Sequence, residues 1–190
     1  MKYSSKVPRH IGIILDGNRR FAKKIMIKTW MGHEWGAKKI EKLVTWCKDL
    51  GIRELTLYAF SLENFNRPRQ EFDFLMNLFL ESFSNFKNDQ RISKYGIKVR
   101  FIGRLGMFPK NVRDAMSELM ENTKYNKNYT INFAMAYSGR AEIIDAVKKL
   151  ATDVSKGKIT VEGINEEIFN KNLYLESEPD LIIRTGGEKR

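Results

Sequence analysis

The chain has 190 residues, of which 42% are hydrophobic and 12% aromatic, enough apolar material for the core of one domain. No stretch approaches the roughly 18 apolar residues of a membrane-spanning helix, and the N-terminus lacks the apolar segment of a signal peptide, so we expect a soluble or peripheral protein. The net charge of +11 favours anionic partners, which include nucleic acid, acidic membranes and phosphorylated small molecules.

The metal-binding residue types are few. The single cysteine, Cys47, excludes an internal disulfide and fits a reducing, cytoplasmic setting. It lies in an apolar segment, which predicts a packed thiol rather than a nucleophile. Together with His10 and His33 it gives no usual zinc-ligand spacing, so we expect no zinc site.

Strand-like and helical patterns alternate along the chain, which is typical of an α/β fold. Runs rich in β-branched residues predict strands, and amphipathic runs predict helices. The strands are expected at 11–15, 54–59, 98–102, 129–136 and 180–183, and the helices at 32–50, 70–86, 109–121 and 139–151. Residues 152–177 are polar and weakly patterned, which predicts a short helix and surface connections. The fold class is therefore α/β with a mostly parallel sheet flanked by helices.

The first predicted strand leads into the turn Asp16, Gly17, Asn18, Arg19 and Arg20, after which a helix starts. The glycine permits close approach of a ligand to the backbone, and the two arginines offer fork-shaped donors for phosphate oxygens. A carboxylate would repel such a ligand unless Mg²⁺ lay between them. The turn therefore predicts a metal–diphosphate site, or else a simple turn in which Asp16 caps the next helix.

Two further polar loops follow predicted strands. Ser61, Asn64 and Arg67 come after the strand at 54–59, and Arg184 and Arg190 flank glycines after the strand at 180–183. Because the carboxyl ends of parallel strands share one edge of a sheet, we expect these loops to face the first turn. These residues also have simpler interpretations. Ser61 and Asn64 could be turn caps and Arg67 could form a surface ion pair, while Arg184 and Arg190 could belong to a solvated basic tail.

The helix at 70–86 is more apolar than one buried stripe requires. Its apolar residues include Phe72, Leu75, Met76, Phe79, Phe83 and Phe86. The pattern fits a core helix, and it also fits a helix that lines a cavity for a hydrocarbon-tailed ligand.

Taken in this order, the three loops resemble those of the cis-prenyltransferases, the undecaprenyl and dehydrodolichyl diphosphate synthase family. The resemblance covers essentially the whole chain. It extends to the Gly32-His33 pair, to Arg67-Pro68 followed by Glu71, and to the segments 101–103 and 136–143. Arg19 and Phe21 make the first loop more similar to archaeal and eukaryotic members than to bacterial ones.

The resemblance implies an enzyme that uses Mg²⁺ to condense isopentenyl diphosphate with an allylic diphosphate, such as geranylgeranyl or farnesyl diphosphate. The product would be a long, undecaprenyl-like polyprenyl diphosphate for glycosyl carrier lipids, grown in a hydrophobic tunnel. Asp16 would be catalytic and bind the metal, and Asn64 would be catalytic, more plausibly by positioning than as a base because an amide is a poor base. The implied substrate-binding residues are Gly17, Asn18, Arg19, Arg20, Phe21, His33, Ser61, Leu62, Glu63, Phe65, Arg67, Arg184 and Arg190.

The resemblance also implies a cytoplasmic homodimer, with peripheral membrane contact for product release and no nucleic-acid partner. Members of the family continue beyond Arg190 with a further metal-binding glutamate, so we expect residues 1–190 to be one domain, truncated at its C-terminus and with exposed apolar surface. Two alternatives remain. One is a non-catalytic subunit of a heteromeric prenyltransferase, and the other is a basic nucleic-acid-binding protein.

Overall fold

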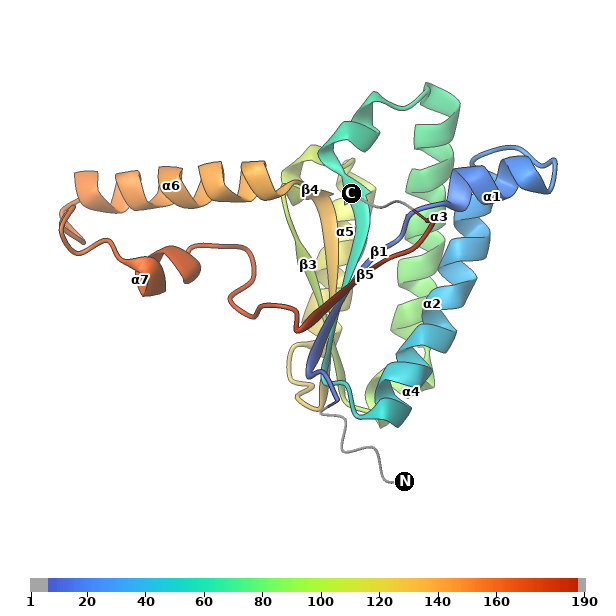
Figure 1. Cartoon of the computed structure of the whole chain (residues 1–190), viewed down its shortest axis with the longest axis horizontal. Coiled ribbons are helices and arrows are strands. Elements are labelled where there is room, and N and C mark those ends of the chain that lie inside the picture. Colours follow the sequence, from blue (N-terminus) through green and yellow to red (C-terminus); the bar gives the residue numbers. More distant parts are fainter. Residues whose placement is uncertain (1–6, 188–190) are drawn as a thin grey trace.

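Five parallel strands form the centre of the molecule, in a computed structural model that describes residues 7–187 (Figure 1). They are β1 (His10–Ile14), β2 (Glu54–Ser61), β3 (Ile97–Ile102), β4 (Tyr129–Tyr137) and β5 (Leu181–Arg184). Their order in the sheet is β3-β4-β2-β1-β5, and every neighbouring pair is parallel. The predicted parallel sheet is confirmed, with strand ends shifted by one or two residues.

The helices also match the predicted pattern in most places. They are α1 (Asn18–Lys24), α2 (Met31–Leu50), α3 (Arg69–Asn88), α4 (Gln90–Lys94), α5 (Lys110–Thr123), α6 (Gly139–Ser155) and α7 (Glu166–Asn170), with 3₁₀ turns η1 (Leu62–Asn66) and η2 (Leu105–Met107). The prediction ended α6 too early, because the first residue that breaks the helix is Gly157, at φ 65°. It missed α4, whose five residues are too few to show a helical period.

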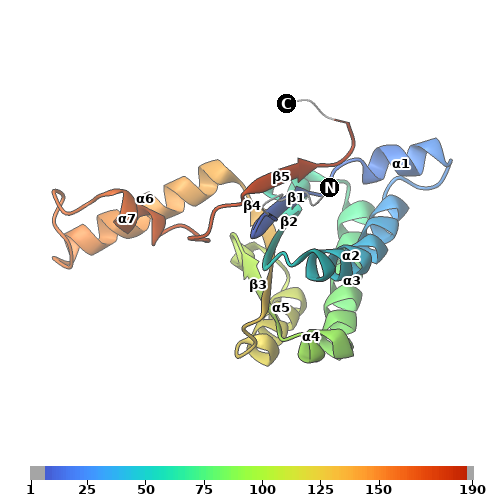
Figure 2. The same cartoon turned by 60° about the horizontal axis from the view of Figure 1, so that its bottom comes forward.

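One face of the sheet is apolar and carries the core. The strand register places Ile13, Leu57, Phe133 and Phe101 side by side on four neighbouring strands, and all are buried. Helices α2, α3 and α5 cover this face (Figure 2). Cys47 of α2 is buried here and burial raises the pKa of its thiol, as expected of a packed cysteine.

The opposite face of the sheet is polar. His10 hydrogen-bonds Thr56 at 2.7 Å, and the Asn132 amide donates to Thr56 at 3.0 Å and to Glu54 at 2.7 Å. The hydroxyl of Ser177 also donates to Glu54, at 2.8 Å. The bond from Ser177 ties the segment that precedes β5 to the sheet.

Helices α6 and α7 pack on each other and extend away from the sheet (Figures 1 and 2). Helix α6 and the edge strand β5 carry apolar side chains that are between 41% and 62% exposed: Ile143, Ile144, Val147, Leu181, Ile182 and Ile183. Among residues 7–187, no helix is long and apolar enough to cross a membrane.

The sheet topology sets the position of the three polar loops. Strands β1, β2 and β5 lie next to one another and run in the same direction, so the loops that follow them meet at one edge. The Thr185 amide donates to the carbonyl of Ile14 at 3.3 Å, which joins the ends of β5 and β1. This edge carries the candidate site.

Candidate functional site

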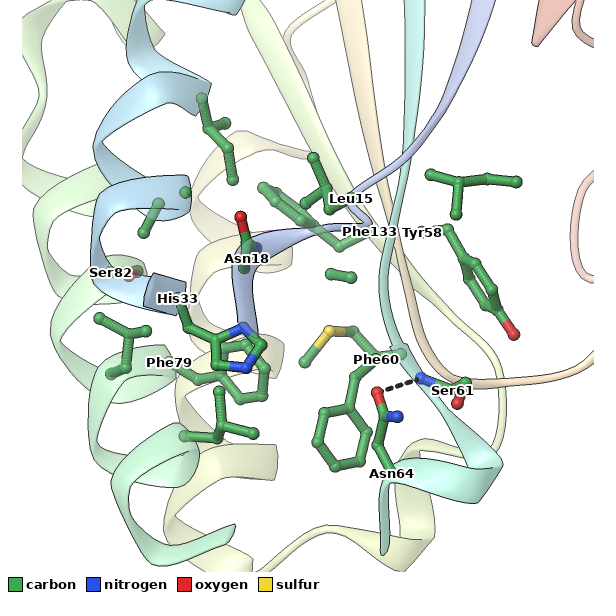
Figure 3. Close-up of a pocket in the computed structure, with 18 of the residues that line it drawn as sticks. Leu15, Asn18, His33, Tyr58, Phe60, Ser61, Asn64, Phe79, Ser82 and Phe133 are labelled. Carbon is green, nitrogen blue, oxygen red and sulfur yellow. Dashed lines mark hydrogen bonds between the residues drawn. The ribbon is translucent and has the colours of Figure 1, made fainter. Parts of the chain in front are cut away.

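A cavity of about 270 Å³ opens at the carboxyl edge of β1 and β2, between the apolar face of the sheet and helices α2 and α3 (Figure 3). Polar residues from the strand-end loops and α2 line part of it: Asp16, Asn18, His33, Ser61, Asn64, Arg67 and Arg184. Apolar residues line the rest, and α3 contributes Leu75, Leu78, Phe79, Phe83 and Phe86. Helix α3 is thus a core helix that also lines a cavity, so both interpretations of its apolar pattern hold, whereas its use by a hydrocarbon chain stays a prediction. The lining suits a ligand with a charged head and an apolar tail.

Asp16 is held by two arginines from different loops. Arg184 donates to its Oδ2 atom through Nε at 3.1 Å and Nη2 at 3.0 Å, and Arg20 Nη2 lies 3.3 Å from the same oxygen. The amide of Gly17 donates to Oδ1 at 2.6 Å. The predicted meeting of the first and third loops is thus present, and it gathers two guanidinium groups around one carboxylate.

The pKa of Asp16 reflects this surrounding. Partial burial works to raise the pKa, but the hydrogen bonds from Arg184 and Gly17 and the charge of Arg20 outweigh burial and lower it below the ordinary value. Asp16 is therefore ionised at neutral pH, which is the state that a metal ion requires of a carboxylate ligand.

Glycines allow the two loops to approach each other. Gly17 has φ 93°, and a Cβ atom placed there would lie 2.9 Å from the Cα atom of Gly186. Thr185, which sequence reasoning missed, then donates to the Asp16 carbonyl at 2.6 Å and accepts from the Asp16 amide at 3.1 Å. No local pattern marks this threonine, because its partner lies 169 residues away in the chain.

A second polar group lies around Glu71, the acidic residue in the first turn of α3. Arg67 donates through Nη1 to Glu71 Oε1 in a very short contact and to His33 Nε2 at 2.9 Å. Arg19 Nε lies 3.5 Å from the same carboxylate oxygen. Sequence reasoning placed Arg67, His33 and Arg19 at the site but gave Glu71 no role, since a buried acid within an amphipathic helix gives no signal of its own.

His33 is neutral in this group. Burial is the main cause that lowers its pKa, the charge of Arg67 lowers it further, and attraction to Glu71 offsets this only in part, which leaves a pKa of about 4. Arginine has no acceptor, so Nε2 of His33 must accept the hydrogen bond from Arg67. The ring proton is therefore on Nδ1, and His33 can donate from that atom.

Asn18 reaches the cavity because α2 has two glycines beside it. A Cβ atom on Gly32 would lie 2.1 Å from the Asn18 carbonyl oxygen, and one on Gly36 would lie 2.8 Å from the Asn18 Nδ2 atom. The start of α1 thus packs directly on the backbone of α2. This contact places Asn18 near His33 in the wall of the cavity (Figure 3).

Ser61 and Asn64 form a capping box at the start of η1. The Ser61 amide donates to Asn64 Oδ1 at 3.1 Å, and the Ser61 side chain accepts from the backbone of Asn64 (Figure 3). The interpretation of these residues as turn caps is therefore confirmed. Both also line the cavity, so the cap holds their side chains in its wall.

Seven of the described residues that were predicted to bind substrate do not line the cavity. Gly17, Arg19 and Arg20 belong to the charged groups around Asp16 and Glu71. Phe21 is exposed on α1, Leu62 and Glu63 belong to η1, and Phe65 packs against Phe60 within an aromatic cluster. A further predicted residue, Arg190, lies outside the described residues.

Within residues 7–187, no group of three or more His, Cys, Asp and Glu side chains is arranged to hold a metal ion. Asp16 is the one carboxylate among the residues that line the cavity. A single carboxylate suits Mg²⁺ when substrate phosphates and water supply the other ligands. The donor set fits a metal that arrives with a diphosphate, and it does not fit a site built from protein ligands alone.

A parallel α/β fold with arginines around one carboxylate, beside an apolar cavity, defines a class of protein suited to amphiphilic phosphorylated ligands. Residues 14–190 match the family described as "Putative undecaprenyl diphosphate synthase". The chain belongs to this family, the cis-prenyltransferases.

Two archaeal relatives support this assignment and the likeness expected from Arg19 and Phe21. The geranylgeranyl-diphosphate-specific tritrans,polycis-undecaprenyl-diphosphate synthase of Pyrococcus furiosus is 50% identical over 186 residues, 97% of this chain and 70% of that protein. The protein of the same name from Methanocaldococcus jannaschii is 46% identical over 188 residues, 97% of this chain and 67% of that protein.

Solved structures agree with the fold. Lavandulyl diphosphate synthase from Lavandula x intermedia, in complex with dimethylallyl diphosphate, superimposes with a TM-score of 0.92 at 32% identity, over 97% of this chain and 80% of that one. A structure described as "a probable undecaprenyl diphosphate synthase" from Campylobacter jejuni gives a TM-score of 0.77 at 31% identity, over 98% and 78%.

The low pKa of His33 predicts that acid destabilises the fold. The histidine has a pKa of 6.5 in the unfolded chain and about 4 in the folded one, so between these values only the unfolded chain is protonated. The free energy of unfolding should fall by about 1 to 2 kcal/mol between pH 7.5 and pH 5 through this group alone. Urea unfolding at both pH values would measure the fall. The His33→Gln variant should show a smaller fall, and an equal fall in both proteins would contradict the prediction.

Proposed function

We propose that the protein is a Mg²⁺-dependent cis-prenyltransferase that condenses isopentenyl diphosphate with an allylic diphosphate. Its product would be a long, undecaprenyl-like polyprenyl diphosphate, the precursor of glycosyl carrier lipids. The observation that carries the proposal is the ionised Asp16, held by Arg20 and Arg184 beside a cavity with an apolar wall. We also propose that residues 1–190 act as a single domain.

The charged groups of the site suit the cleavage of an allylic diphosphate. The bond between the allylic carbon and the diphosphate oxygen breaks, and the terminal alkene carbon of isopentenyl diphosphate bonds to the allylic carbon. Loss of a proton from the isopentenyl unit restores the double bond, and the released diphosphate, on which negative charge collects, can accept that proton. Donors such as Arg19, Arg20, Arg67 and the Nδ1 proton of His33 stabilise that charge, because charge-assisted hydrogen bonds strengthen as it develops. Mg²⁺ bound by Asp16 would supply further positive charge at the same diphosphate.

Arg184 and Asn64 have separate roles in the proposal. Arg184 lies at the end of β5 and takes the diphosphate of isopentenyl diphosphate, exchanging part of its contact with Asp16 for phosphate oxygens. Asn64 is fixed by the capping box with Ser61, and a neutral amide is a poor base, so it positions the reacting carbons rather than accepting their proton.

The apolar part of the cavity receives the hydrocarbon chain. Phe79, Phe83 and Phe86 lie on α3, while Phe133 and Met135 face them from β4. These residues exclude water from the chain and supply dispersion contacts along its length. The wall therefore favours extension of the product between α3 and the sheet.

Removal of the Asp16 carboxylate tests the proposed mechanism. Asp16→Ala should lower transfer of labelled isopentenyl diphosphate to a butanol-extractable product by about a thousandfold or more, because metal and leaving-group stabilisation are lost together. EDTA should abolish transfer by the unsubstituted protein, and added Mg²⁺ should restore it. Circular dichroism would check that the variant is folded.

Near-normal transfer by Asp16→Ala in the presence of Mg²⁺ would exclude the mechanism. Absence of transfer by the unsubstituted protein would instead favour a non-catalytic subunit. Salt-sensitive binding of RNA that isopentenyl diphosphate does not displace would favour a nucleic-acid-binding protein.

The allylic primer is proposed to be geranylgeranyl diphosphate, as the names of the archaeal relatives specify for those proteins. The longer apolar chain buries more surface in the cavity than that of farnesyl diphosphate, at about 0.8 kcal/mol per methylene. We expect kcat/KM to be at least about tenfold higher for geranylgeranyl than for farnesyl diphosphate. Steady-state rates with both primers would measure the ratio, and a preference for the shorter primer would contradict the assignment.

We propose that the protein is a homodimer in the cytoplasm with peripheral membrane contact. Ile144 and Val147 of α6 and Ile182 of β5 are large apolar residues that are about half exposed, and exposed apolar surface often marks a protein–protein contact. Sedimentation velocity should give a dimer for the parent protein and a monomer for the Ile144→Lys/Val147→Lys variant. A monomeric parent would contradict the dimer.

The membrane contact has its own test. We expect the parent protein to co-float with acidic lipid vesicles, and failure to do so would contradict the membrane contact.

A further inference from the structure

Glu71 is the most deeply buried charged residue of the site. Its side chain is 2% exposed, although it lies only three residues into α3. One oxygen, Oε1, contacts Arg67, lies 3.5 Å from Arg19 Nε and lies 3.6 Å from His33 Nε2. The mechanism proposed above gives this carboxylate no part, although it touches three of the residues assigned to the diphosphate.

The three partners come from three different elements. Arg19 belongs to α1 and His33 to α2, and Arg67 is the residue that directly follows η1. Glu71 therefore joins these three elements to α3. A buried carboxylate loses its hydration, and this loss costs several kcal/mol unless charged and hydrogen-bonded partners compensate for it. Here the basic residues beside the cavity compensate for the lost hydration of Glu71. They must therefore stay close to its carboxylate, so the position of Glu71 determines theirs.

A second pair on the same helix shows that spacing alone does not explain the arrangement. Arg69 and Asp73 have the same i, i+4 relation as Arg67 and Glu71, and their ion pair is 2.9 Å long. That pair is 84% and 50% exposed, so it is an ordinary surface ion pair that contributes little to stability. The Glu71 group differs in its burial, its additional partners and its place beside the cavity.

Glu71 cannot bind a diphosphate directly, because both are negatively charged. Its effect must pass through the basic side chains that it holds. Arg67 meets Glu71 and His33 through the single atom Nη1, which leaves Nε and Nη2 for phosphate oxygens. Glu71 thus fixes the guanidinium plane while the remaining donors stay available for a ligand.

We propose that Glu71 is a positioning residue that holds Arg67, His33 and Arg19 together as one binding unit for the allylic diphosphate. The inference rests on the proposed function, because it takes an allylic diphosphate as the ligand. Without the buried carboxylate, the two guanidinium groups repel each other and lose their common acceptor. Binding of the diphosphate must then order these side chains, and the free energy that this requires weakens the affinity.

Titration calorimetry of the full chain with geranylgeranyl diphosphate and Mg²⁺ tests this role. Glu71→Gln keeps the size of the side chain and removes its charge, and we expect it to raise the Kd by about tenfold to a hundredfold, the value of a hydrogen bond to a charged group. Asp73→Asn makes the same chemical change in the exposed pair of the same helix. This control should leave the Kd within about twofold of the parent value.

The stoichiometry of the titration separates positioning from folding. A purely structural role would lower the fraction of protein that binds and leave the Kd of the folded fraction unchanged. Glu71→Asp retains the charge on a shorter side chain and provides a variant that keeps a buried anion, so we expect a Kd between those of the parent and Glu71→Gln. Parent-like Kd values in both Glu71 variants would overturn the proposal.

A double substitution tests whether Glu71 acts through Arg67. In an Arg67→Ala background, Glu71→Gln should raise the Kd by less than it does alone, because the main group that it positions is absent. Fully additive effects would overturn the proposed route. If the parent protein itself fails to bind geranylgeranyl diphosphate, the proposed function fails with it, whereas a binding parent with unaffected Glu71 variants rejects the inference alone.

Discussion

The contact between Asp16 and Arg184 joins the ends of two adjacent parallel strands, and the rest of the site depends on it. The two residues are 168 positions apart in the chain and meet because β1 and β5 pair in parallel register. Two guanidinium groups on one carboxylate fix the first turn where Gly17 and Gly186 let the backbones approach. The pairing of β1 with β5 thus places charged residues from distant parts of the sequence at one edge of the sheet.

The same parallel sheet divides polar from apolar chemistry. Residues such as Leu57 and Phe133 alternate with Thr56 and Asn132 along β2 and β4, so one face takes the helices and the other takes a hydrogen-bonded segment. The apolar face continues past the strand ends into the wall of the cavity. A charged edge beside an apolar wall follows from the topology, before any individual catalytic residue is considered.

Much of this arrangement could be predicted from the sequence, because its signals are local. The β-branched run before Asp16 predicted a strand, the apolar period of α3 predicted a helix of the core or of a cavity wall, and parallel topology predicted that the loops would meet. Contacts without a local signal could not be predicted. Thr185 contacts Asp16 across 169 positions, and Glu71 meets Arg19 and His33 only because folding brings them to its local partner Arg67. The projection of α6 from the sheet depends on packing that no period of residues specifies.

The two acids of the site, Asp16 and Glu71, differ in whether their basic partners can be exchanged, and the difference in their burial explains this. Asp16 is 29% exposed, so its arginine partners can rearrange and a cation can reach it without a large desolvation cost. Glu71 is 2% exposed and its partners cannot leave without stranding a buried charge. In the proposed mechanism, an exchangeable carboxylate beside a fixed one would let the site reorganise around an incoming diphosphate at Asp16 while Arg67 and His33 stay in place at Glu71.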